Sequence, residues 1–479
     1  MMERRMTIRT VRFFLGCVIL VFAGTATWAQ EPAATIQKQT PPAGGPPKAF
    51  NVPAHETYTL PNGMRVTLVP YGNMPKVAVS LVVRAGALNE PHDVMGVADI
   101  TGELLKEGTK TLSARALAEA AAGMGSSLSV TAGADETAVD MDALSEYGGA
   151  AVKLVADVVM HPALPDSEIA RLKANLLRQV IVAKSRPSQI ALARFRKLMY
   201  GDHPYGEILP TEASLNEMTS EDTRKFYAAN YGAERAHLYV AGKFDVAAVK
   251  RAINESFSDW SKGSAPDLDV PKAKTQRLLD VTDRPNAPQS TIYVGLPVAD
   301  PSNPDNIPLT VTNTLLGGSF GSRITSNIRE QKGYTYSPTS QISRRYHDAY
   351  WAEIADVTTA ATGPSLKEIF GEIDRLQKSP PEAAELHGIQ SYMSGLFVIQ
   401  NSTRQALITQ LRYVDLQGLG EDYLKDYVQK VNAVTSEDVQ RMTAKYIKPE
   451  QMTIVVVGDK SKITEQLAPY AVADSSEAK

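Results

Sequence analysis

The feature that most constrains the fold of this chain is an internal repeat. The segment that starts at Met218, MTSEDTRKFYAANYGAERAHLYVAGKFD, matches the one that starts at Val434, VTSEDVQRMTAKYIKPEQMTIVVVGDKS, at an offset of 216 residues. A second match, offset by 211 residues, pairs Leu104, which precedes a Gly-Thr turn, with Leu315, which precedes two glycines. Two matches at nearly the same offset indicate two copies of one domain.

Each copy mixes strands with helices. ETYTLPNGMRVTLVP alternates apolar and polar residues around a Pro-Asn-Gly turn, which predicts a β-hairpin. The spacing of apolar residues then predicts a strand in 76–86, helices in 96–108 and 113–125, strands in 126–144, and long helices in 146–160 and 166–184. The predicted fold class is α+β, with two homologous α/β-sandwich domains produced by internal duplication.

The repeat also sets the predicted domain boundaries, because 479 residues are too many for one ordinary core. The first domain is expected at 55–262 and the second at 277–468. A linker at 263–276 lies in the stretch SKGSAPDLDVPKAKTQ, and a flexible tail is expected at 469–479.

The N-terminus resembles an export signal. MMERRMTIRTVR is basic, FFLGCVILVFAG is apolar, and TATWAQ offers a cleavage site after Ala29. The apolar run is shorter than the roughly 20 residues that a membrane span needs. We therefore expect a cleaved signal peptide at 1–29 and a periplasmic mature form without a membrane segment, with an uncleaved anchor as the alternative. A Pro-, Ala- and Gly-rich tether at 30–54 follows.

Cysteine content and charge exclude two classes of protein. Cys17 is the only cysteine and would leave with the signal, so a disulfide-stapled fold is excluded. The formal net charge of −3 becomes about −6 when residues 1–29, with four arginines and one glutamate, are removed. This balance argues against a nucleic-acid partner.

A metal motif is missing from the helix in GVADITGELLKEGT, residues 96–109. A zinc peptidase helix carries two His four residues apart with a Glu between them, but Asp99, Gly102 and Glu103 occupy that spacing here. The seven His lie at least 34 residues apart. Asp99 and Glu103 share a helix face, but a hard cation needs more oxygen ligands, so a solvated acidic face is the favoured interpretation.

The second half contains a stretch with potential binding groups, LLGGSFGSRITSNIREQKGYTYS. Gly317 and Gly318 predict a flexible loop whose amides can approach a ligand. A helix carrying Arg329 and a strand carrying Tyr336 are expected to follow. A guanidinium and a phenol that reach the same point would stabilise an oxyanion or hold a peptide backbone. The residues alone favour a surface Arg and a packed Tyr.

Together these segments resemble the pitrilysin/insulinase family of zinc peptidases, in the branch of mitochondrial processing peptidase and its bacterial relatives. YTLPNGMRVTLVP is similar to the family's opening hairpin, and GVADITGELLKEGT to the helix that in active members reads Gly-Leu-Ala-His-Phe-Leu-Glu-His-Met-Leu-Phe-Lys-Gly-Thr. YGDHPYGEILPTEASLNEMTSEDTRKFYAANY resembles the distal first-half segment, and IREQKGYTYS the second-half Arg/Tyr motif. The resemblance covers about residues 55–465.

The resemblance implies that the zinc site is lost. Asp99 replaces the first His, Gly102 the catalytic Glu and Glu103 the second His, while the distal Glu ligand falls near Gln179. Neither catalytic residues nor bound zinc are expected on this chain. Arg329 and Tyr336 keep the separation that the family's Arg/Tyr motif has. The resemblance therefore implies that they bind substrate, with Gly317 and Gly318 beside them, instead of being a surface Arg and a packed Tyr.

These resemblances lead to one main hypothesis. The chain is expected to be the non-catalytic, substrate-binding subunit of an exported heterodimeric zinc metalloendopeptidase that acts on peptides or unfolded proteins. A homologous partner subunit would carry the zinc. The alternative is a structural or peptide-binding protein of the same fold without a peptidase partner. An unorthodox hydrolase and a homodimer also remain open at this stage.

Overall fold

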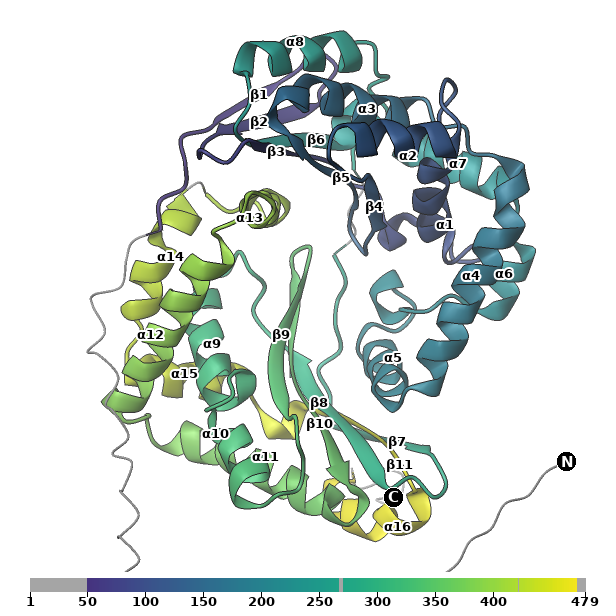
Figure 1. Ribbon diagram of the computed structural model, residues 1–479. Helices are drawn as coiled ribbons and strands as arrows, with labels where there is room; N and C mark the ends of the chain where they lie inside the picture. The colour runs from purple at the N-terminus through teal and green to yellow at the C-terminus, as the bar shows by residue number, and fades with distance from the viewer. Residues whose placement is uncertain (1–49, 267–269, 421, 472–479) are drawn as a thin grey trace, which may run out of the picture. The chain divides into compact units, whose positions relative to one another are not determined.

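The computed structural model describes residues 50–266, 270–420 and 422–471, whose strands form two sheets (Figure 1). The predicted signal peptide at 1–29 and most of the predicted tether lie outside the described residues. None of the described helices combines the length and the apolar character that crossing a bilayer requires.

The strands of the first sheet are β1 (Glu56–Thr59), β2 (Arg65–Pro70), β3 (Lys76–Val83), β4 (Ser129–Ala132), β5 (Thr137–Leu144) and β6 (Ala236–Gly242). Those of the second are β7 (Leu278–Asp283), β8 (Gln289–Pro297), β9 (Thr339–Arg345), β10 (Asp348–Thr358) and β11 (Thr453–Gly458).

The helices of the first half are α1 (Val97–Leu104), α2 (Ala114–Gly123), α3 (Gly148–Met160), α4 (Asp166–Ser185), α5 (Pro187–Tyr200), α6 (Glu212–Glu217), α7 (Ser220–Asn230) and α8 (Val246–Phe257). Those of the second half are α9 (Asn306–Asn313), α10 (Arg323–Thr325), α11 (Thr362–Lys378), α12 (Ala383–Gln400), α13 (Arg404–Leu416), α14 (Asp422–Asn432), α15 (Ser436–Tyr446) and α16 (Lys460–Leu467).

Both sheets have the same topology. Apart from the edge strand β1, the first sheet has the order β2-β6-β3-β5-β4 and the second the order β7-β11-β8-β10-β9. In each half the last strand therefore lies between the first two, parallel to the first and antiparallel to the second. The predicted α+β fold with two homologous domains is confirmed.

The local sequence signals act as predicted. In the β1–β2 hairpin, the amide of Leu60 donates to the carbonyl of Met64 at 2.8 Å, and Gly63 adopts the positive φ of 95° that the turn requires. In both copies of Thr-Ser-Glu-Asp, the threonine caps a helix. The amide of Thr219 donates to the carboxylate of Asp222 at 2.8 Å, and the second copy repeats this capping box.

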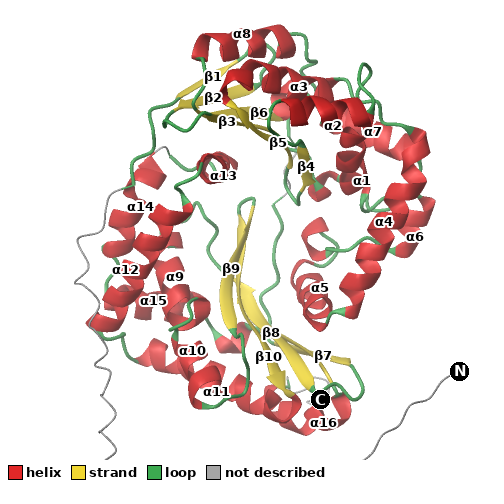
Figure 2. Cartoon of the chain, in the orientation of Figure 1, coloured by secondary structure: helices red, strands yellow, loops and turns green. Residues whose placement is uncertain are grey.

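Each sheet packs one face against helices of its own half. In the first half the core lies between the sheet and α1, α3 and α8, and in the second half between the sheet and α9, α11 and α15 (Figure 2). The strands that form these faces are rich in Val, Ile and Leu, which suits strands covered on both sides.

The opposite face of each sheet is covered by a helix from the other half. Helix α5 packs on β8 and β11 of the second sheet, where Phe195 contacts Tyr293 at a ring distance of 4.6 Å. Helix α13 packs on β3 and β6 of the first sheet, where Leu407 lies in one apolar cluster with Tyr239. This reciprocal exchange of helices joins the two halves.

The described ends of the predicted tether and tail also make contacts. Phe50 is buried against Phe397 of α12, with a ring distance of 5.1 Å. Tyr470 donates a hydrogen bond to the carbonyl of Gly363 at 3.1 Å. Within the predicted linker, the amide of Lys274 donates to the carbonyl of Met199 at 2.8 Å, so this part of the linker contacts the end of α5.

Candidate functional site

The helix that carries the degenerate metal motif has a well-defined start. Gly96 precedes α1 with a φ of 90°, a conformation that favours glycine. The carboxyl group of Glu90 accepts hydrogen bonds from the amides of Gly96 at 3.0 Å and Ala98 at 2.8 Å. These bonds satisfy amides that a helix start leaves without partners, and they fix the orientation of α1.

The structure brings the four predicted motif positions together. Asp99, Gly102 and Glu103 of α1 and Gln179 of α4 line one cavity of about 220 Å³, whose third wall is the edge strand β4. We call this cavity the Asp99 pocket. Asn175, one turn before Gln179, also lines it and was not identified from the sequence.

The predicted solvated acidic face lines the Asp99 pocket. Asp99 is exposed to solvent, and Glu103 is partly exposed. Partial desolvation of the Asp99 carboxyl group, together with repulsion by Glu103, raises its pKa to about 6. Glu103 instead forms an ion pair with Lys106 at 2.8 Å. Both carboxylates therefore reach solvent, as expected for an acidic face, while α4 and β4 form the other walls of the pocket around them.

The donor set of the pocket does not fit catalytic zinc. Such a site uses three His or carboxylate ligands and a base for the bound water, whereas this pocket offers no imidazole and has a glycine where the base would stand. Within the part of the chain that the structure describes, no group of three His, Cys, Asp or Glu side chains is placed to hold a metal ion.

The second predicted cluster lies around Gly317. Gly317 and Gly318 are not in a flexible loop as predicted, but end a π-helical turn, Thr314–Gly318. A Cβ atom at Gly317 would lie 2.5 Å from Oε2 of Glu353 and 2.6 Å from Oγ of Ser340. The glycine is therefore required by close packing against β9 and β10. Glu353 is fully buried, and this burial raises its pKa well above the usual value.

Arg329 lies between two exposed aromatic rings. Its guanidinium carbon is 4.2 Å from the ring centre of Phe320 and 5.0 Å from that of Tyr336. These rings are 71% and 79% exposed, whereas the Arg329 side chain is only 21% exposed. We call these three residues the Arg329 cluster. It gives the two predicted residues a common location, and it adds Phe320, which the sequence analysis missed.

The terminal nitrogens of Arg329 remain available. Its Nε atom lies 3.3 Å from a carboxylate oxygen of Glu330, and no partner of its two Nη groups is found among the described residues. A guanidinium held between rings but free at its outer edge can bind a carbonyl or carboxylate oxygen. Phe320 follows two glycines and a serine, and an aromatic residue in such a segment is the sequence signal that could have identified it.

The predicted strand at Tyr336 is not formed. Gly333 has a φ of 66°, and only an isolated bridge between Thr335 and Val357 precedes β9, which begins at Thr339. The turn leaves Tyr336 in an irregular segment, where its ring extends toward solvent and packs on Arg329. A strand would have placed its ring against the sheet or directly away from it.

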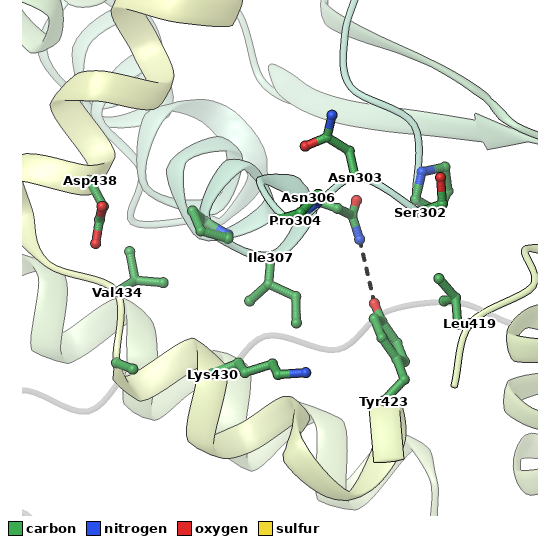
Figure 3. A pocket seen from close by; sticks show the side chains of 13 residues that line it. Ser302, Asn303, Pro304, Asn306, Ile307, Leu419, Tyr423, Lys430, Val434 and Asp438 are labelled. Carbon is green, nitrogen blue, oxygen red and sulfur yellow. Dashed lines mark hydrogen bonds between the residues drawn. The ribbon is translucent and has the colours of Figure 1, made fainter. Parts of the chain in front are cut away.

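A larger and more apolar cavity, of about 400 Å³, lies elsewhere in the second half (Figure 3). Its walls come from the segment that leads into α9, from α14 and from the start of α15. At its edge, the amide nitrogen of Asn306 lies 3.5 Å from the hydroxyl of Tyr423. None of the predicted site residues lines it, so the two clusters described above remain the candidates.

Two family models match successive parts of the chain. Residues 65–211 match the family model described as insulinase (peptidase family M16), and residues 217–393 match the model described as peptidase M16 inactive domain. The chain belongs to the insulinase family, peptidase M16. The predicted family resemblance is thereby confirmed.

Relatives in this family are similar along most of their length. The protein named uncharacterized zinc protease YmxG of Bacillus subtilis is 25% identical over 384 residues, which covers 80% of this chain and 93% of YmxG. An uncharacterized zinc protease of Mycobacterium leprae is 28% identical over 293 residues, covering 59% of this chain and 65% of the relative.

Solved structures show the same fold. The peptidase M16 inactive domain from Pseudomonas fluorescens has a TM-score of 0.79 at 23% identity, covering 84% of this chain and 98% of that one. A protease from Helicobacter pylori also has a TM-score of 0.79, at 20% identity, covering 85% and 100%. The periplasmic protease PqqL from Escherichia coli has 0.73 at 17% identity, covering 86% of this chain and 47% of PqqL.

Proposed function

We propose that this M16 chain is the non-catalytic, substrate-binding subunit of an exported two-subunit zinc metalloendopeptidase that acts on peptides or unfolded proteins. One combination of features carries the proposal. The pocket at the motif positions has a donor set that does not fit catalytic zinc, while Arg329 lies between two exposed rings with no partner for its Nη groups among the described residues. Binding without chemistry is the function that these two features support together.

The Arg329 cluster suits a peptide. The Nη groups of Arg329 can donate to a backbone carbonyl or to a carboxylate, and the flanking rings restrict the guanidinium before the ligand arrives. Phe320 and Tyr336 add exposed aromatic area for an apolar side chain of the same peptide. In the proposed role these residues bind and orient the substrate, with Gly317 and Gly318 holding the preceding turn close to β9.

The edge strand β4 offers a second mode of contact. It ends the first sheet, and Val130, Thr131 and Ala132 form one wall of the Asp99 pocket. An edge strand presents unpaired amide and carbonyl groups, to which an extended peptide can add as a further strand. A polypeptide bound there would run beside the Asp99 pocket.

The comparisons support the partner and the compartment only by analogy. The relatives are named zinc proteases, so a homologous subunit that keeps the metal residues is the proposed partner of this chain. PqqL is described as periplasmic, which agrees with export through the N-terminal segment 1–29. Neither assignment depends on the other.

Activity assays of the reconstituted pair test the proposal. The partner is sought as a neighbouring gene product of similar length that carries His-x-x-Glu-His. This chain alone should cleave no peptide, and the pair should cleave unfolded protein in a chelator-sensitive manner. Arg329→Ala should lower kcat/KM of the pair by about 10- to 100-fold, since a charged contact to the substrate is lost.

Matched variants separate binding from folding. Arg115, on α2, is 88% exposed and serves as the control for Arg329. Tyr336→Phe keeps the ring and should retain most activity if the ring acts by stacking, whereas Tyr336→Ala should not. Cleavage by the isolated chain, or a pair whose turnover is unchanged by Arg329→Ala, would contradict the proposal. Peptide binding by a chain that forms no peptidase complex would favour the alternative of a peptide-binding protein.

A further inference from the structure

The C-terminal part of α4 exposes apolar residues among cations. The segment Arg178–Arg186 reads RQVIVAKSR. Val180 is buried, as expected for the inward face, but Ile181 and Val182 are 58% and 48% exposed. Adjacent β-branched residues on the outer face of a helix are unusual unless something packs on them.

Val182 borders a groove. A hollow of about 640 Å³ is lined by Arg178, Val182, Ala183, Arg186 and Gln189, which belong to the end of α4 and the start of α5. We call it the α4 groove. Its remaining walls are Asn175 and Gln179, which also line the Asp99 pocket, so the groove and the pocket are adjacent.

The groove carries positive charge that no carboxylate of the described residues neutralises. Among these residues, Arg178 donates to the amide oxygen of Asn175, and no side-chain partner is found for Arg186 or for Lys184, which lies next to the groove in sequence but does not line it. A further guanidinium, that of Arg284, donates to the carbonyl of Ser185 at 3.3 Å. None of the described residues that line the groove is acidic.

The adjacent Asp99 pocket has the opposite sign. Asp99 and Glu103 lie on its α1 wall, so an anionic side chain is repelled there and attracted to Arg178 and Arg186. Guanidinium groups bind carboxylates through paired hydrogen bonds, and Val182 and Ala183, which line the groove, can cover an aliphatic side chain next to them. Charge complementarity therefore defines the occupant.

We infer that the α4 groove binds an acidic segment of the substrate polypeptide, in which carboxylate side chains lie next to aliphatic ones. The inference rests on the proposed function, because it names the substrate class of the same binding chain. It adds a specificity site that is separate from the Arg329 cluster. The acidic segment contacts Arg178 and Arg186, while the peptide continues past Gln179 toward β4.

Direct binding to three labelled peptides tests the inference. The peptides share one Leu- and Val-containing sequence and carry either Glu, Gln or Lys at the same two positions. Binding to the purified full chain is measured by fluorescence anisotropy at about 50 and about 300 mM salt. The Glu peptide should bind about tenfold more tightly than the Gln peptide at low salt, and the difference should shrink at high salt.

A charge reversal locates the preference. The double variant Arg178→Glu, Arg186→Glu should lose the preference for the Glu peptide, while Arg251→Glu, which reverses an exposed cation on α8, should keep it. Thermal unfolding midpoints check that both variants fold. Equal binding of the Glu and Gln peptides, or a preference that survives the double reversal, would overturn the inference.

The Arg329→Ala variant separates this result from the proposed function. This variant should weaken the binding of all three peptides by the same factor and leave the preference for the Glu peptide unchanged. If Arg329→Ala has no effect while the double reversal removes the preference, the assignment of Arg329 fails and the α4 groove stands. If Arg329→Ala weakens peptide binding while the double reversal leaves the preference for the Glu peptide unchanged, the groove assignment fails and the proposed function stands.

Discussion

Gly102 and Gly317 lie in corresponding helical regions of the two halves, but their neighbours differ. A Cβ atom at Gly102 would lie 3.5 Å from Val130 and 3.6 Å from Ala132, which is ordinary van der Waals contact. At Gly317 the same atom would overlap Glu353 and Ser340. Gly102 is therefore not required by packing.

This difference predicts opposite effects of one substitution. Gly102→Ala should raise the free energy of unfolding by about 1 kcal/mol, because alanine is the better helix former and the space is available. Gly317→Ala should lower it by about 1–3 kcal/mol, because the new methyl group overpacks a buried site. Urea denaturation followed by circular dichroism measures both, and each variant is the control for the other. An unchanged midpoint for Gly317→Ala would show that packing does not require this glycine.

At the scale of elements, the exchanged helix α13 is held by a network of charges around Asp415. Its carboxylate accepts hydrogen bonds from Arg65, from Arg84 at 3.2 Å and from His237 at 3.2 Å, all of which belong to the first half. Burial opposes ionisation of Asp415, but His237 and the two arginines outweigh it and hold its pKa well below the usual value. These interactions connect α13, from the second half, to the first half.

Removing this carboxylate should weaken the connection between α13 and the first half. Asp415→Ala should lower the free energy of unfolding by about 2–4 kcal/mol at neutral pH, since it leaves partly buried cations without their partner. A depressed pKa in the folded state stabilises the protein above the unfolded-state value of 3.8, and this contribution is lost as the pH falls below it. The difference between wild type and variant should therefore shrink in acid.

Urea midpoints at several pH values measure this effect. Asp422→Ala removes a carboxylate whose side chain is 79% exposed, at the start of α14, and should change little. A difference between wild type and Asp415→Ala that stays constant down to about pH 3 would mean that Asp415 is not held ionised by its neighbours.

The elements show what the sequence could and could not provide. The hairpin at Gly63 and the helix caps at Thr219 and Thr435 were predicted because their signals are local. The exchange of α5 and α13 was not predicted, since amphipathic periodicity shows that a helix buries one face but not which sheet receives it. The network at Asp415 was missed for the same reason, because its members are separated by up to 350 residues.

The candidate site was predictable in part. The spacing of Asp99, Gly102 and Glu103 on one helix is local, and the structure places Gln179 beside them as the resemblance implied. Phe320 and Asn175 were missed because their roles depend on which segments fold next to them. The expected strand at Tyr336 failed because a glycine turn, at Gly333, overrode the alternation of side chains.

At the scale of the whole molecule, the two homologous halves carry different candidate sites. Both halves have the same strand topology, but the Asp99 pocket occurs in the first half and the Arg329 cluster in the second. The first half has a cavity between α1, α4 and β4 whose side chains do not fit a catalytic metal. Whether the backbone of this pocket can hold a zinc ion can be tested by introducing metal-ligating side chains at the four motif positions.

The fourfold variant Asp99→His, Gly102→Glu, Glu103→His, Gln179→Glu should bind about one zinc ion per chain, whereas the wild type should bind none. The pocket of about 220 Å³ already holds these four positions together, so two imidazoles and one carboxylate can converge without movement of the helices. Elemental analysis after dialysis measures the zinc. A matched variant with Gln179→Ala in place of Gln179→Glu lacks the third ligand and should lose most of the metal. If the fourfold variant folds and stays free of zinc, then α1 and α4 have moved apart from a metal-binding geometry, and the loss of function in this half involves its backbone as well as its side chains.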